Sequence, residues 1–175
     1  DSTRIYYTID GLYPTPYSTL YTSPFTTTEK VTIRAIACRE GHRNSPIAQV
    51  VNWFEHAGAT YRITSTDSLR VVVSASTGGN NEEDYCGHYT FESTIQHDTT
   101  TYTLEGFDTG AFRNAIRLRS VVVEDCPVRH VGDSLFHGCI ALNAVVWEAA
   151  TALPDEVFDD DSDGNLLVYL PDTVA

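Results

Sequence analysis

The sequence predicts a mainly β protein with two parts: an antiparallel, sandwich-like part and an array of short repeats. β-forming residues are abundant, and the 175 residues include 10 Tyr but no Met, a composition that is atypical of a helical bundle. In the first third of the chain, apolar and polar residues alternate in short runs between turn residues, as they do in half-buried strands. In the last third, aromatic residues recur at a nearly constant interval, which indicates internal repeats.

Length and charge limit the possible functions. A chain of 175 residues can bury a core, either as one domain or as two small modules. The 24 acidic and 11 basic residues give a formal net charge of −13, which repels nucleic-acid phosphates and anionic lipid surfaces. We therefore expect no nucleic-acid partner. No run approaches the roughly 18 consecutive apolar residues of a membrane span, so we expect no membrane insertion.

Three strands are predicted near the N-terminus. Each has alternating or β-rich character, and Gly and Pro residues separate the first from the second. The predicted strands are residues 5–9 (IYYTI), 31–37 (VTIRAIA) and 47–53 (IAQVVNW). Turn residues 40–44 (EGHRN) join the last two strands. Their spacing is that of hairpins, which predicts half of a β-sandwich.

These segments, together with Gly11, Pro14 and Pro24 between the first two strands, resemble the chitobiase/β-hexosaminidase C-terminal domain family over residues 1 to 53. The resemblance implies an immunoglobulin-like β-sandwich module that is attached to bacterial glycosidases and surface proteins and has no catalytic residues of its own. Members carry further strands ahead of the first one seen here. It therefore implies a partial immunoglobulin-like module over residues 1–56.

Three phenylalanines mark the repeats of the second part. Phe112, Phe136 and Phe158 are spaced by 24 and 22 residues, and an apolar residue precedes each by five positions. Later in each copy come the paired apolar positions of a short strand, which are Val121 with Val123, Val145 with Trp147, and Val168 with Leu170. One such unit cannot bury its apolar side, so about three units over residues 107–175 must stack on one another.

The middle copy, residues 132–145 (GDSLFHGCIALNAV), resembles the BspA-like leucine-rich repeats of bacterial surface proteins. Residues 84–91 and 100–107 are similar to the β-rich segment that caps the first repeat in Bacteroides-type members. Across residues 57–175 the resemblance implies a capped leucine-rich-repeat β-solenoid, with a β-hairpin cap at 57–106. It also implies a secreted, cell-surface location and adhesion through the repeat surface.

The cysteines are too few for a disulfide-held miniprotein. We expect Cys38, Cys86, Cys126 and Cys139 to be buried free thiols that pack as small hydrophobic residues. The alternative, that one or two are exposed or bridged, stays open. Two histidines, His130 and His137, lie near Cys126 and Cys139, but their spacing matches no zinc motif that we can justify.

An acidic run near the C-terminus is a candidate metal site. Asp159, Asp161 and Asp163, followed by a glycine, match the first half of a calcium-binding EF-hand loop. The bidentate glutamate that completes such a loop is replaced by Leu170. We therefore predict a solvated acidic loop, with a weak Ca²⁺ site as the alternative, and no metal or cofactor elsewhere.

Two loop aromatics are candidate ligand contacts. Strand alternation places Tyr6 and Tyr7 on opposite faces, whereas Tyr13 and Tyr17 fall in the loop after the first strand. Aromatic faces stack on sugar rings and are enriched at protein interfaces. Sugar contact through Tyr13 and Tyr17 is the functional alternative to a purely structural role.

No group of residues in the sequence predicts an enzyme. Cys86 with His88 lacks the partners of a thiol nucleophile, and the carboxylates of residues 82–84 lie together in one loop, whereas a glycosidase pair faces across a cleft. The sequence favours a non-catalytic bacterial cell-surface binding or adhesion protein, with surface proteins or glycans as partners. The alternatives are an accessory carbohydrate-targeting module of a glycoside hydrolase and a structural spacer.

Overall fold

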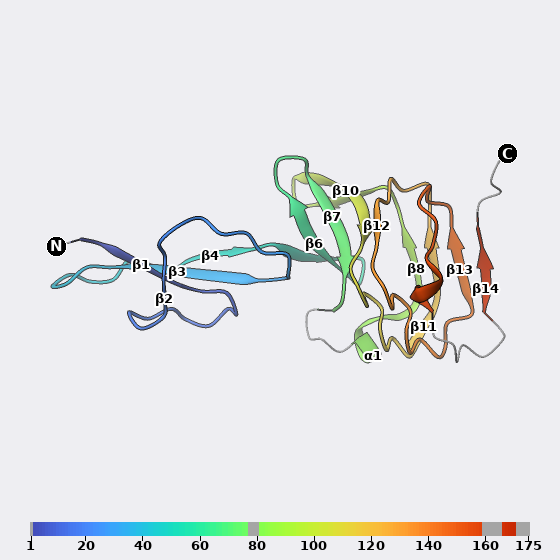
Figure 1. Ribbon diagram of the computed structural model, residues 1–175, viewed down its shortest axis with the longest axis horizontal. Coiled ribbons are helices and arrows are strands. Elements are labelled where there is room, and N and C mark those ends of the chain that lie inside the picture. The colour runs from blue at the N-terminus through green and yellow to red at the C-terminus, as the bar shows by residue number, and fades with distance from the viewer. Residues whose placement is uncertain (1, 77–80, 159–165, 171–175) are drawn as a thin grey trace. The chain divides into compact units, whose positions relative to one another are not determined.

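The computed structural model describes residues 2–76, 81–158 and 166–170, and the predicted mainly β class is confirmed. The chain divides into two compact units, Asp1–Trp53 and Phe54–Ala175, whose strands are coloured along the chain in Figure 1. The boundary that the sequence suggested, between residues 56 and 57, falls in the same stretch of chain.

The first unit contains a four-stranded antiparallel sheet, which we call sheet A. Its strand order is β2-β1-β3-β4, and its strands are β1 (Arg4–Thr8), β2 (Thr19–Leu20), β3 (Thr32–Cys38) and β4 (Ala48–Val51). The three strands predicted from alternation are confirmed as β1, β3 and β4. The sequence analysis missed β2, because a pair of residues is too short to show a period. It joins β1 opposite Tyr6 and Tyr7.

Sheet A forms one layer among the described residues of this unit, so the predicted half-sandwich is seen as a single sheet. Its core is small, since Val31 and Ile36 are its apolar side chains with exposed fractions of only 6% and 5%. One sheet face is partly covered by Phe25, whose ring stacks on Tyr7 with centroids 5.0 Å apart. Ile5, on the same face, remains 43% exposed.

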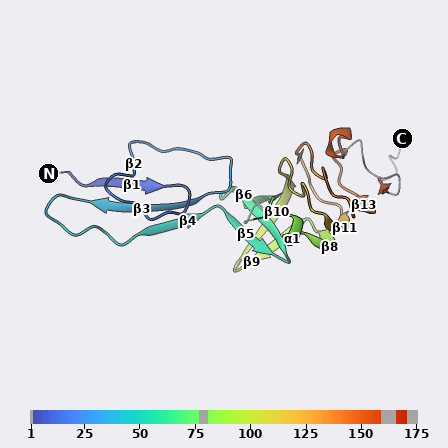
Figure 2. The ribbon, with the colours of Figure 1, turned by 90° about the horizontal axis from the view of Figure 1, so that it is seen from below.

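The second unit contains two further sheets. Sheet B has the order β12-β10-β7-β6-β5, with β9 paired to β10, and sheet C has the order β14-β13-β11-β8. The strands of sheet B are β5 (Trp53–His56), β6 (Ala59–Ser65), β7 (Arg70–Ser74), β9 (Thr94–His97), β10 (Thr100–Phe107) and β12 (His130–Val131). Those of sheet C are β8 (Cys86–Phe91), β11 (Arg117–Val123), β13 (Ala144–Trp147) and β14 (Leu167–Tyr169). A single helical turn, α1 (Asn81–Asp84), and a 3₁₀ turn, Asp155–Val157, lie in the connections (Figure 2).

Parallel pairing aligns the successive copies. In sheet C, Val121 of β11 lies opposite Val145 of β13, and Val145 lies opposite Val168 of β14, as the repeat spacing predicts. In sheet B, β10 pairs in parallel with both β7 and β12. Parallel pairing alone does not establish a complete β-solenoid, so the solenoid stays a prediction.

The segment expected to act as a cap, residues 57–106, contributes strands to both ladders. It supplies β7 to sheet B, and it supplies β8, which pairs in parallel with β11, to sheet C. It also forms two antiparallel pairs, β6 with β7 and β9 with β10. The parallel stacking therefore begins before the first phenylalanine that marks a copy.

The three marker phenylalanines stack on one another. The rings of Phe112 and Phe136 have centroids 5.6 Å apart at 4°, and those of Phe136 and Phe158 are 5.4 Å apart at 18°. Close packing also requires glycine at position 132, because a Cβ on Gly132 would lie 2.1 Å from the backbone nitrogen of Thr109. No side chain fits there without moving the backbone.

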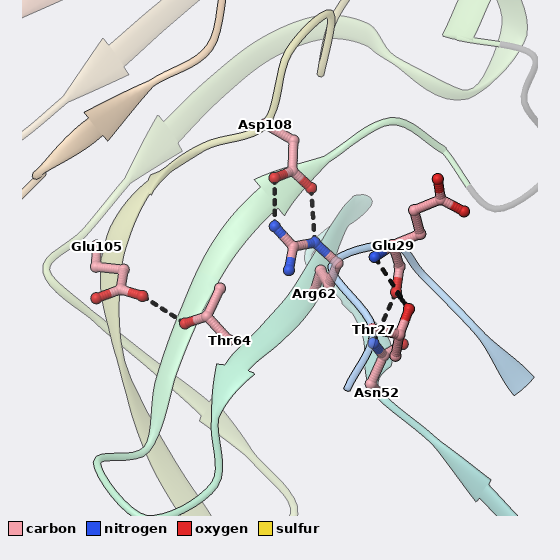
Figure 3. A network of polar contacts seen from close by, with 7 residues as sticks. All are labelled: Thr27, Glu29, Asn52, Arg62, Thr64, Glu105 and Asp108. Carbon is pink, nitrogen blue, oxygen red and sulfur yellow. Dashed lines mark hydrogen bonds and ion pairs between the residues drawn. The ribbon is translucent and has the colours of Figure 1, made fainter. Parts of the chain in front are cut away.

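A polar network crosses the strands of sheet B (Figure 3). The Arg62 guanidinium donates two hydrogen bonds to Asp108, of 2.6 and 2.9 Å, and these side chains are only 13% and 22% exposed. Glu105 accepts a hydrogen bond from the Thr64 hydroxyl and pairs with Arg70 at 3.3 Å. The network links residues 35 to 46 positions apart in the chain.

The same figure shows Asn52, whose side chain forms hydrogen bonds to backbone groups of the first unit. The Asn52 side chain accepts a hydrogen bond from the Val31 backbone and donates one to the Glu29 carbonyl, both at 2.8 Å. Asn52 follows β4, and Val31 precedes β3, so this amide fastens the end of one strand to the start of its neighbour.

We predict that Phe136→Ala lowers the free energy of unfolding of the second unit by about 3–5 kcal/mol, because it removes a ring packed between two others. Urea unfolding followed by Trp147 fluorescence measures this in a Trp53→Phe background, so that the signal comes from the second unit alone. Ile140→Ala, in the same copy but 81% exposed, is the control and should change stability by under about 0.5 kcal/mol. Equal losses of unfolding free energy in the two variants would show that the ring stack does not contribute specially to stability.

We predict that Asp108→Asn destabilises the second unit by about 1.5–3 kcal/mol, because Arg62 loses a charge-assisted, bidentate partner. A double-mutant cycle with Arg62→Met separates the pair's coupling from the effects of each change alone. Coupling below about 0.5 kcal/mol would show that the pair acts as an ordinary surface ion pair.

Candidate functional sites

The outward side of sheet C presents two rows of side chains. In the central strands β11 and β13, inward residues such as Val145 and Trp147 are buried, while the alternate residues Ala144 and Val146 are half-buried. The paired registers align the outward residues into the rows His88, Ser120, Ala144, Leu167 and Thr90, Val122, Val146, Tyr169. We call these eight residues the sheet C face.

The sheet C face combines an apolar centre with a polar side. Leu167 and Tyr169 are 58% and 57% exposed, and Tyr169 continues the row that contains Val122 and Val146. On β8, the His88 ring nitrogen Nδ1 lies 2.7 Å from the Ser120 hydroxyl oxygen. Arg117, at the start of β11, is exposed and forms no ion pair among the described residues.

A second candidate site is a hollow of about 510 Å³ in the first unit. Its lining includes six residues with polar atoms, which are Ser2, Arg4, Tyr6, Arg39, Glu40 and Asn44. They come from β1, from the residues just before it and from the β3–β4 connection. Sequence reasoning missed this hollow, because its residues are far apart in the chain and carry no motif.

The two predicted ligand tyrosines lie in different surroundings. The Arg34 guanidinium covers the Tyr13 ring at 4.7 Å from the centroid, so one ring face of Tyr13 is occupied. Tyr17 is 98% exposed and directly follows Pro16, which lines the hollow. Tyr17 itself is not part of the lining. Sugar contact by either tyrosine stays a prediction.

The sequence contains two groups of residues that could bind a metal, an acidic run and a cysteine–histidine cluster. Asp159, Asp161 and Asp163 lie outside the described residues. The thiols of Cys126 and Cys139 donate hydrogen bonds to different strands and turns, at the Phe91 and Phe112 carbonyls. Within residues 2–76, 81–158 and 166–170, no group of three or more metal-ligating side chains converges.

The cysteines differ in exposure. Cys126 is 2% exposed, Cys38 and Cys139 are half-buried and Cys86 is exposed, and all four are free thiols. The expectation of buried thiols is correct for Cys126 and wrong for Cys86, which lies at the start of β8 with its side chain outward. Burial raises the pKa of the Cys126 thiol to about 12, and the nearby carboxylates of Asp125 and Glu124 act in the same direction.

Two buried polar side chains also escaped the sequence analysis. Asn81, which the sequence analysis did not single out, is 7% exposed. Its amide donates to the Ala111 and Arg113 carbonyls at 3.2 and 2.9 Å. Tyr85 is 1% exposed and donates to the Ser74 carbonyl at 2.6 Å. Burial raises its pKa to about 12. Both residues position the start of sheet C, and only the folded chain shows their partners.

Comparison with known proteins identifies the first unit. Residues 1–49 match the chitobiase/β-hexosaminidase C-terminal domain. This match agrees with the resemblance seen in the sequence. It covers less than a third of the chain. The search of curated proteins found no match.

Among solved structures, the chain is similar to a leucine-rich cell surface protein from Faecalibacterium prausnitzii A2-165, with 19% sequence identity and a TM-score of 0.42. The similarity covers 58% of this chain and 24% of that one. Among the described residues, no helix is both long enough and apolar enough to span a membrane.

We predict that a thiol reagent at pH 8 modifies Cys86 rapidly and Cys126 only after unfolding, because Cys126 is buried and only about 10⁻⁴ of its thiol is ionised at that pH. Cys86→Ser should remove the fast phase, while Cys126→Ser should leave it unchanged. The raised pKa also means that Cys126 favours the folded state below about pH 9 and that this contribution is lost as the pH rises toward 12. Mass spectrometry of modified peptides measures the order in which the cysteines react. Labelling of Cys126 before unfolding would contradict the prediction.

Proposed function

We propose that the chain is a non-catalytic binding module at a bacterial cell surface, and that the sheet C face contacts an extracellular protein. The observation that carries this proposal is the continuous outward face formed by four parallel strands. Aligned rows of exposed and half-exposed apolar residues are unusual on a surface that contacts only water. They suit the centre of a protein interface, where charged residues are depleted.

The composition of the face favours a protein partner. Val122, Val146 and Tyr169 supply flat apolar area, and Tyr is among the residues that contribute most to binding energy at interfaces. Arg117 beside this area can pair with a carboxylate at the interface rim. The outward residues come from four strands of one sheet, which favours a broad contact with a protein.

The absence of catalysis is part of the proposal and rests on where the carboxylates lie. Glu105 and Asp108 are held by arginines, and Glu82, Glu83 and Asp84 are together on one exposed helical turn. A glycosidase needs two carboxyl groups about 5–10 Å apart across a bound sugar. Glu105 and Asp108 instead pair with arginines, and residues 82–84 are consecutive on one turn.

A second function is favoured by the match of residues 1–49 to the chitobiase/β-hexosaminidase C-terminal domain. In this alternative, the chain is an accessory module that positions a carbohydrate-active enzyme. It predicts binding to a glycan, with the sheet C face uninvolved.

We predict that Val146→Glu lowers affinity for the partner at least tenfold, because it buries a charge at the centre of the contact. Binding is measured by surface plasmon resonance against immobilised extracellular proteins, including fibronectin, laminin, collagen and mucin. Ile140→Glu, which adds the same charge at an 81% exposed position outside the sheet, is the matched control.

Loss of binding in Val146→Glu alone, with unchanged circular dichroism, supports the proposal. The absence of saturable binding to any protein on the panel, or equal binding by both variants and the unaltered chain, overturns it.

A further inference from the structure

Three segments of the chain line the hollow of the first unit. β1 supplies Arg4 and Tyr6, which are two positions apart and therefore lie on one sheet face. Arg4 pairs directly across the sheet with Cys38, which also lines the hollow. Tyr6 is half-buried, so its ring is held in place by neighbours. One wall is thus built on paired strands.

The second wall is the β3–β4 connection, which backbone hydrogen bonds hold in place. The His42 backbone donates to the Arg39 carbonyl at 3.1 Å, and the Ser45 backbone donates to the Ala37 carbonyl at 2.9 Å. The Ser45 hydroxyl in turn accepts a hydrogen bond from the Ala37 backbone at 2.9 Å. These bonds fix the base of the loop that carries Arg39, Glu40 and Asn44.

The third wall contains Pro16 and is fixed by a turn. The Ser18 backbone donates to the Thr15 carbonyl, and the Thr15 backbone donates to the Ser18 hydroxyl, both at 2.9 Å. Tyr17 follows Pro16 with its side chain 98% exposed. The Tyr17 ring is therefore free of packing and can stack on a sugar that extends beyond the hollow.

The charges in the hollow favour an anion. Arg4 and Arg39 are both exposed, and neither forms an ion pair among residues 2–53, whereas Arg62 and Arg70 of the second unit do. Glu40 is the acidic residue of the lining, which leaves an excess of one positive charge. Residues 1–53 contain five basic and four acidic residues, a formal charge of +1, although the whole chain carries −13.

We propose that this hollow binds a carboxylate-bearing sugar, with Arg4 and Arg39 paired to the carboxylate and the polar residues around them bonded to ring hydroxyls. A guanidinium binds a carboxylate through two parallel hydrogen bonds. Ser2, Asn44 and Glu40 can donate to or accept from hydroxyl groups, and a volume of about 510 Å³ lies in the roughly 300–1,000 Å³ range of small-ligand sites. The site belongs to the first unit and does not depend on the sheet C face.

The test is isothermal titration of the full chain with 3′-sialyllactose and with trigalacturonate, which carry a carboxylate on two different sugars. Lactose and galactotriose are their neutral counterparts, and sodium acetate tests the carboxylate alone. We expect saturable binding of at least one acidic sugar, and at least tenfold weaker binding of its neutral counterpart and of acetate.

Variants locate the site. Arg4→Gln and Arg39→Gln should each weaken binding at least tenfold. Arg43→Gln, which removes the same charge from the same exposed loop but outside the hollow, should change affinity less than twofold. No saturable binding of either acidic sugar up to about 10 mM, equal binding of the neutral sugar, or an equal loss in Arg43→Gln overturns the proposal.

Cys38 supplies a second measurement that does not depend on these variants. In a Cys86→Ser background, the bound acidic sugar should slow modification of Cys38 by a thiol reagent at least fivefold, and Arg39→Gln should remove that protection. Binding without protection of Cys38 would place the sugar elsewhere and overturn the assignment. Neither result affects binding of proteins to the sheet C face, so the two proposals fail separately.

Discussion

The stacking of aromatic rings between successive copies is the constraint on which the second unit depends. A strand and a turn of about two dozen residues cannot bury a phenylalanine alone, so each ring must be covered by its neighbours. Phe136 satisfies this condition because it lies between Phe112 and Phe158. Parallel hydrogen bonding sets the same spacing for the strands, so that Val121 faces Val145. Ring stacking and backbone pairing therefore select one common register, and the close approach at Gly132 follows from it.

The first unit is held together by different means. Its buried apolar side chains are few, so hydrophobic burial contributes less, as expected for a unit of about 50 residues. Side chains that bond to the backbone of distant segments supply part of the difference: Asn52 ties the strand ends, and Ser45 ties the base of a loop. A sheet held at its edges and loops leaves room for a polar hollow between them, which a tightly filled core does not.

The sequence predicted those parts of the fold that depend on periodicity. Alternation located β1, β3 and β4, and the phenylalanine spacing predicted which residues of sheet C lie opposite one another. The two-residue strand β2 and the buried Asn81 were missed, because a short strand has no period and a buried amide looks like any loop residue until its carbonyl partners are known. The hollow was missed for a related reason: Arg4 and Arg39 are brought together only by the pairing of β1 with β3. Cys86 was expected to be buried because cysteine usually is. It is exposed because it begins β8 with its side chain on the outward side.

The two-residue period of a strand separates stability from recognition in sheet C. Val121 and Val145 point inward and are fully buried, while their chain neighbours Val122 and Val146 point outward and are half-buried. A change at an outward position alters the exposed surface and leaves the inward packing in place. A change at an inward position removes packing from two adjacent copies at once. Because each copy adds one strand to the same sheet, the outward face widens with the number of copies.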